Sequence, residues 1–121
     1  MAGKNILVID DEASIREFIK DFFEDRGFNV EIASDGIEGI DKCLKGEFDL
    51  VLTDMLMPKL IGLEVLRRIK AARPEQKVIV MTGVKERSMA DRAKEIGCHS
   101  YLTKPIQLAE LVKRVAECFP G

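Results

Sequence analysis

The feature that most constrains the fold is a fivefold alternation between short strand-like runs and longer segments with helical periodicity. The strand-like runs lie at residues 6–9, 28–33, 48–53, 78–81 and 99–102. The first and fourth are continuously apolar instead of alternating with polar residues. Continuous apolar runs of this length are typical of strands that are buried on both faces of a parallel sheet.

The intervening segments carry apolar residues at the three- and four-residue spacing of an amphipathic helix. We expect the following residues to face the core: Ile15, Phe18, Ile19, Phe22 and Phe23; Ile37, Ile40 and Leu44; Leu63, Leu66 and Ile69; Met89, Ala93 and Ile96; and Leu108, Leu111, Val112 and Val115. Five strands alternating with five helices predict the α/β class, a doubly wound five-stranded parallel sheet flanked by five helices. The pattern alone does not order the strands.

Length and charge limit the classes of function. With 121 residues the chain is long enough for a single domain, and we expect one domain over residues 1–121, with a short tail at 1–4 and no output domain. The net charge of −2 argues against direct binding of nucleic acid. No apolar run approaches the roughly 18 residues of a membrane span. Three widely spaced cysteines match no metal-binding pattern, so we expect free thiols and a cytoplasmic protein.

Polar residues that can carry out chemistry follow the predicted strands. Asp10 and Asp11 come after the first strand, Asp54 after the third, Thr82 after the fourth and Lys104 after the fifth. The carboxyl ends of parallel strands meet at one edge of the sheet, where open α/β folds hold their ligands. Clustered carboxylates repel one another unless a cation compensates, and Mg²⁺ prefers oxygen ligands of this kind. The arrangement predicts phosphoryl transfer to a carboxylate, with metal and lysine neutralising the transferred charge.

These residues resemble the receiver domains of two-component response regulators, which are CheY-like. The resemblance extends over nearly the whole chain and rests on the following motifs, in order: Asp10-Asp11, Asp54 with Met57-Pro58 and Gly62 behind it, Thr82-Gly83, Tyr101 and Lys104-Pro105. It implies the flavodoxin-like strand order 2-1-3-4-5. It also implies a phosphorelay switch that takes a phosphoryl group from a histidine kinase or phosphotransfer protein and signals to an output partner.

The resemblance further implies a role for each matching residue. Asp54 would be the phosphoacceptor. Asp10, Asp11, Asp54 and the backbone carbonyl of Leu56 would bind Mg²⁺, with Mn²⁺ as a possible substitute. Lys104 and Thr82 would contact the phosphoryl group, Thr82 and Tyr101 would move together as the switch, and the bond before Pro105 would be cis. The surface of the fourth helix, fifth strand and fifth helix would change on phosphorylation and would be a possible homodimer interface.

Two alternatives stay open at the level of sequence. A Mg²⁺-dependent phosphohydrolase would use the same aspartyl-phosphate chemistry, but such enzymes generally carry an acid/base carboxylate where this chain has Leu56. A degenerate receiver-like interaction module would lack the site, whereas Asp11, Asp54, Thr82 and Lys104 are all present. We therefore expect a regulatory domain that catalyses only its own phosphorylation and slow dephosphorylation.

Overall fold

A computed structural model describes residues 3–55 and 62–119 of the chain. Its elements alternate along the sequence as β1 (Asn5–Ile9), α1 (Ala13–Glu24), β2 (Asn29–Ala33), α2 (Gly36–Lys45), β3 (Leu50–Thr53), α3 (Gly62–Ala72), β4 (Lys77–Thr82), α4 (Arg87–Ile96), β5 (Ser100–Thr103) and α5 (Leu108–Glu117). The strands form one parallel sheet in the order β2-β1-β3-β4-β5. The predicted α/β class and strand order are therefore confirmed.

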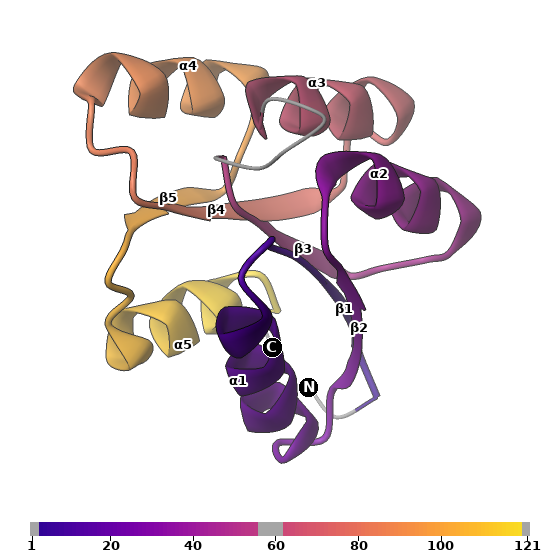
Figure 1. The fold of residues 1–121 in the computed structure, drawn as a ribbon. Helices are drawn as coiled ribbons and strands as arrows, with labels where there is room; N and C mark the ends of the chain where they lie inside the picture. Colours follow the sequence, from indigo (N-terminus) through magenta and orange to yellow (C-terminus); the bar gives the residue numbers. More distant parts are fainter. Residues whose placement is uncertain (1–2, 56–61, 120–121) are drawn as a thin grey trace.

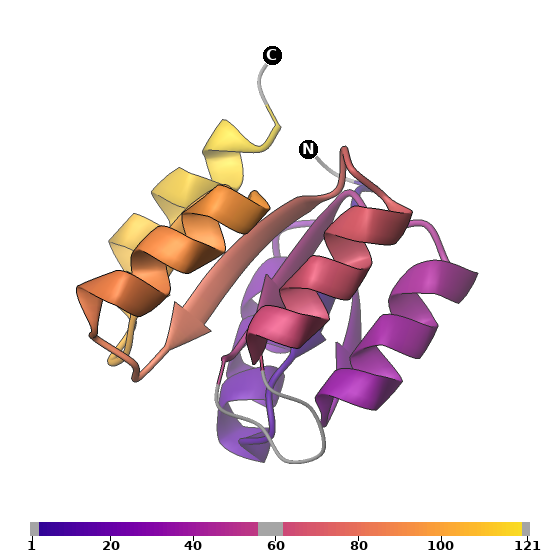
Figure 2. The same cartoon turned by 90° about the horizontal axis from the view of Figure 1, so that it is seen from above.

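The sheet is the middle of three layers. Helices α1 and α5 cover one face, and α2, α3 and α4 lie in a row over the other (Figures 1 and 2). In β1, Ile6 and Val8 pack in the core beneath α1 and α5, whereas Leu7 and Ile9 pack in the core beneath the other three helices. All four side chains are fully buried, because successive strand residues point to opposite faces and both faces are covered. This explains the continuous apolar run at residues 6–9.

Five residues expected in the core are instead exposed: Phe18, Ile37, Leu44, Leu108 and Val112, with Phe18 57% exposed. The prediction was wrong at these positions because each apolar stripe is wider than the arc of helix that touches the sheet. On α1, Ile19 and Phe23 occupy the buried line and Ile15 and Phe22 flank it. Phe18 lies at the outer edge and stacks on Phe22.

None of the helices in the described parts of the chain is both long and apolar enough to cross a membrane. The three cysteines are buried free thiols, as the sequence predicted. Asp35 begins α2 by accepting a hydrogen bond from the Glu38 backbone N–H at 2.8 Å. Gly27 follows α1 with a φ of 90°, a conformation that favours glycine and turns the chain toward β2.

Candidate phosphoryl-acceptor site

Three of the predicted site residues lie one position beyond the end of a strand. Asp10 follows β1, Asp54 follows β3 and Lys104 follows β5. Each backbone N–H still donates to the last residue of a neighbouring strand: Asp10 to Ala33 O at 3.1 Å, Asp54 to Ile9 O at 2.9 Å and Lys104 to Thr82 O at 2.8 Å. The backbone of the sheet thus holds these three residues at its carboxyl edge.

The Lys104 ammonium connects the acidic residues. Its Nζ lies 2.9 Å from Asp10 Oδ2, 2.9 Å from Asp54 Oδ2 and 3.0 Å from Glu12 Oε1. Burial by itself would lower the pKa of Lys104, but the hydrogen bonds to Asp54, Asp10 and Glu12 outweigh it and raise the pKa. The amine therefore carries a positive charge at neutral pH. The Lys104–Pro105 peptide bond is cis, as the resemblance led us to expect.

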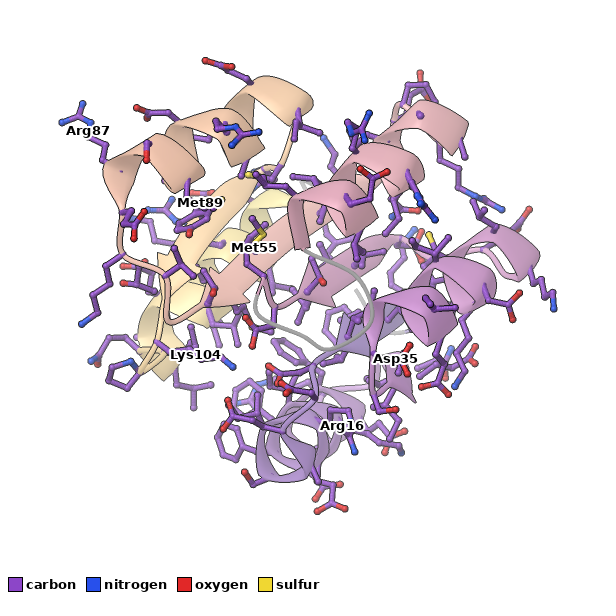
Figure 3. All side chains as sticks on the ribbon, turned by 45° about the horizontal axis from the view of Figure 1, so that its top comes forward. Arg16, Asp35, Met55, Arg87, Met89 and Lys104 are labelled. Atoms are coloured by element: carbon purple, nitrogen blue, oxygen red, sulfur yellow. The ribbon has the colours of Figure 1, made fainter. Side chains whose placement is uncertain are left out.

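Asp10 is the most buried carboxylate of the site. Burial raises the pKa of its carboxyl group, and the Glu12 backbone N–H and the Lys104 ammonium offset this rise only in part. Its Oδ1 accepts a hydrogen bond from Glu12 N at 2.9 Å. Arg16, which Figure 3 labels together with Lys104, donates to the Asp10 backbone oxygen at 2.7 Å. Hydrogen bonds to both the side chain and the backbone of Asp10 thus hold the turn from β1 into α1.

Asp54 is held in a fixed orientation. Its Oδ1 accepts a hydrogen bond from Met55 N at 2.6 Å, while its Oδ2 faces Lys104. Behind Met55, the backbone of Gly62 approaches so closely that a Cβ there would lie 2.3 Å from Met55 Cα. Gly62 N also donates to Met55 O at 3.1 Å. Gly62 is therefore required by close packing against Met55, the residue whose backbone N–H orients the Asp54 carboxylate.

The carboxylates form a group that can hold a metal ion. One oxygen from each of Asp10, Asp11, Glu12 and Asp54 lies within 4.8 Å of all the others. Lys104 contacts three of these four carboxylates, those of Asp10, Glu12 and Asp54. This all-oxygen donor set fits a hard divalent cation such as Mg²⁺. Leu56, whose carbonyl was predicted as a further ligand, lies outside the described residues.

Glu12 is the one member of this group that sequence reasoning missed. It directly follows the Asp10-Asp11 pair, which was the available signal. Its position in the sequence does not indicate a contact with a residue that follows the last strand. Only the fold brings Lys104 to it.

Thr82 and Tyr101 meet at a different point, the loop between β4 and α4. The buried Thr82 hydroxyl accepts a hydrogen bond from Val84 N at 3.2 Å. The Tyr101 hydroxyl donates to the backbone oxygen of Val84 at 2.7 Å. Burial raises the pKa of the half-buried Tyr101 phenol, so it remains a donor at neutral pH. The two predicted switch residues therefore hold one backbone unit from both sides.

Comparisons with known proteins agree with this geometry. The family model of the response regulator receiver domain matches residues 6–116 of this chain. The chain is 37% identical over 110 residues to the transcriptional regulatory protein DltR of Streptococcus agalactiae serotype III (strain NEM316), covering 91% of this chain but only 49% of that protein. It is 32% identical over 120 residues to sporulation initiation phosphotransferase F of Bacillus subtilis (strain 168), covering 99% and 97% of the two chains.

A solved structure is also similar to this chain. The response regulator protein TrrA of Thermotoga maritima, in complex with Mg(2+)-BeF, superposes with a TM-score of 0.87 at 33% identity, covering 96% of this chain and 99% of that one. Family model, relatives and fold all agree. The chain belongs to the response regulator receiver domains, the phosphorylation switches of two-component signal transduction.

Proposed function

We propose that this chain accepts a phosphoryl group on Asp54 from a phosphohistidine of a histidine kinase or phosphotransfer protein, with Mg²⁺ bound beside it. The observation that carries the proposal is the Lys104 ammonium, 2.9 Å from both Asp54 and Asp10 within a group of four carboxylates. The relatives support it, since TrrA was solved with Mg(2+)-BeF and another relative is named a phosphotransferase. Mn²⁺ offers similar oxygen chemistry.

The transfer is a displacement at phosphorus. A lone pair on an Asp54 carboxylate oxygen forms the new P–O bond while the P–N bond to the partner's imidazole breaks, and the electrons of that bond stay on the imidazole nitrogen. Lys104, protonated and already at the acceptor, donates to a phosphoryl oxygen and stabilises its charge. Asp10, Asp11, Asp54 and the Leu56 carbonyl would hold Mg²⁺, which when bound neutralises charge on the transferred group.

The switch follows from the two contacts at Val84. If the Thr82 hydroxyl turns toward the new phosphoryl group, it no longer accepts from Val84 N, and the loop that Tyr101 holds is released. Helix α4 starts three residues later, at Arg87, and Glu86 at its N-cap provides no side-chain hydrogen bond. The start of α4 therefore depends on this loop, which couples the site to the α4–β5–α5 surface.

A change on that surface would be read by an output domain or partner protein, or by a second copy of the chain. The chain itself acts as a regulatory domain that catalyses only its own phosphorylation and slow dephosphorylation, in a cytoplasmic signalling pathway. The chain spans about half the length of DltR.

The experiment is incubation with acetyl phosphate and Mg²⁺, followed by intact mass. We expect a gain of one phosphoryl group that disappears in Asp54→Ala and with a chelator. Asp41→Asn, which removes an exposed carboxylate on α2, is the matched control and should be phosphorylated like the wild type. Loss of the mass gain in Asp41→Asn, or its persistence in Asp54→Ala, would contradict the assignment.

A further inference from the structure

The Lys104 ammonium has no donor left for a new ligand. An ammonium group carries three N–H donors. Three carboxylates engage Lys104, namely Asp10, Asp54 and Glu12, at 2.9, 2.9 and 3.0 Å. An incoming phosphoryl oxygen can therefore bond to Lys104 only by replacing one of them.

The three contacts are not equally easy to replace. The Asp10 side chain is fully buried and that of Asp54 is 5% exposed, so until the new P–O bond forms neither carboxylate gains water on leaving Lys104. Glu12 has a side chain that is 55% exposed. When it leaves Lys104, water can hydrate its carboxylate at once. Glu12 is thus the contact that the phosphoryl group displaces.

The local structure of Glu12 supports the same assignment. Glu12 occupies the N-cap position of α1, where a side chain commonly accepts a hydrogen bond from the first turn, yet its side chain makes no capping bond. Its backbone N–H is held by Asp10 Oδ1 at 2.9 Å. The backbone is therefore fixed while the side chain reaches Lys104, which lies 92 residues further along the chain.

We infer that Glu12 is a positioning residue that holds Lys104 in the resting site and yields it to the phosphoryl group, so that it slows phosphorylation by competing for the ammonium. The inference rests on the proposed function of Asp54 and Lys104. Glu12 is neither the acceptor nor the lysine, and it was not among the predicted metal ligands, although its carboxylate belongs to the group that can hold the ion.

Two measurements test this inference on the whole chain. The first is the second-order rate constant for phosphorylation by acetyl phosphate at saturating Mg²⁺. The second is the rate at which Lys104 is acetylated by an N-hydroxysuccinimide ester without divalent cations, followed by peptide mass. Glu12→Gln should raise both rates about two- to fivefold, the effect of breaking one exposed ion pair.

Two further variants separate the contact from charge alone. Glu12→Asp keeps the charge but is one methylene shorter, so it should lose the contact and raise both rates as Glu12→Gln does. Glu17→Gln removes an equal charge from an exposed position on α1 and should leave both rates unchanged. Two outcomes would overturn the inference: equal effects of Glu17→Gln and Glu12→Gln, or a Glu12→Asp variant that behaves like the wild type. Either would mean that the negative charge of the side chain slows the reaction by repelling the phosphoryl donor, and not by its contact with Lys104.

Failure of the inference can be told from failure of the proposed function. Unchanged Lys104 acetylation in Glu12→Gln overturns the inference, whether or not phosphorylation is detected. A wild-type chain that gains no phosphoryl group overturns the proposed function. An unchanged or lower phosphorylation rate in Glu12→Gln, with a reactive wild type, overturns the competition alone.

Discussion

Replacing Gly62 with alanine should destabilise the fold and misplace the Asp54 carboxylate. The new Cβ would lie 2.3 Å from Met55 Cα and 2.7 Å from Met55 O. These are backbone atoms, so the cost should be near the upper end of the roughly 1–3 kcal/mol that overpacking gives. The gain in helix propensity at the first residue of α3 returns at most about 1 kcal/mol. We expect a net loss of about 2 kcal/mol in the free energy of unfolding.

A loss of that size lowers Tm by about 8 °C in a domain of this length. The assay is urea and thermal unfolding followed by circular dichroism. Gly83→Ala is the matched control, since a Cβ there meets nothing within 4 Å, and its change should stay within about 0.5 kcal/mol. Because Met55 N orients Asp54 Oδ1, Gly62→Ala should also slow phosphorylation of the folded fraction. Equal stability of the two alanine variants would refute the close approach of Gly62 to Met55.

Three further predictions concern the metal, the pH and a helix cap. Mg²⁺ at about 100 times its Kd should stabilise the wild type by about 2.7 kcal/mol, and Asp11→Asn should need more Mg²⁺ for an equal shift in Tm; no shift in the wild type would contradict the metal site. Burial raises the pKa of Asp10 above 3.8, so the native state binds more protons, and the unfolding free energy should fall as pH rises from 3.8 through the raised pKa. Denaturant titrations in chelator should show no such fall in Asp10→Asn, and a rise in the wild type would reverse the sign. Asp35→Ala removes the α2 cap and should cost about 1 kcal/mol in chemical unfolding, whereas a neutral result would mean that the Glu38 N–H finds another acceptor.

Much of the fold and of the site could be predicted from the sequence alone, because the apolar composition of a strand indicates whether both of its faces are buried. A run such as residues 6–9 is apolar at every position only where a sheet is covered on both faces. Polar residues that directly follow such runs lie at the carboxyl edge of the parallel sheet, regardless of how the helices pack. This is why Asp10, Asp54 and Lys104 could be assigned to one site before any coordinates.

The contacts that only the tertiary structure decided are those set by packing angles and by the reach of long side chains. Phe18 has the spacing of a core residue but lies outside the arc of α1 that touches the sheet. Glu12 and Lys104 meet although β3 and β4 lie between β1 and β5, because the long Lys104 side chain extends along the carboxyl edge of the sheet to Asp54, Asp10 and Glu12. Thr82 and Tyr101 meet at Val84 because of how the β4–α4 loop folds back. Periodicity records which residues avoid water, whereas the partner of each polar group depends on distances that only the assembled layers define.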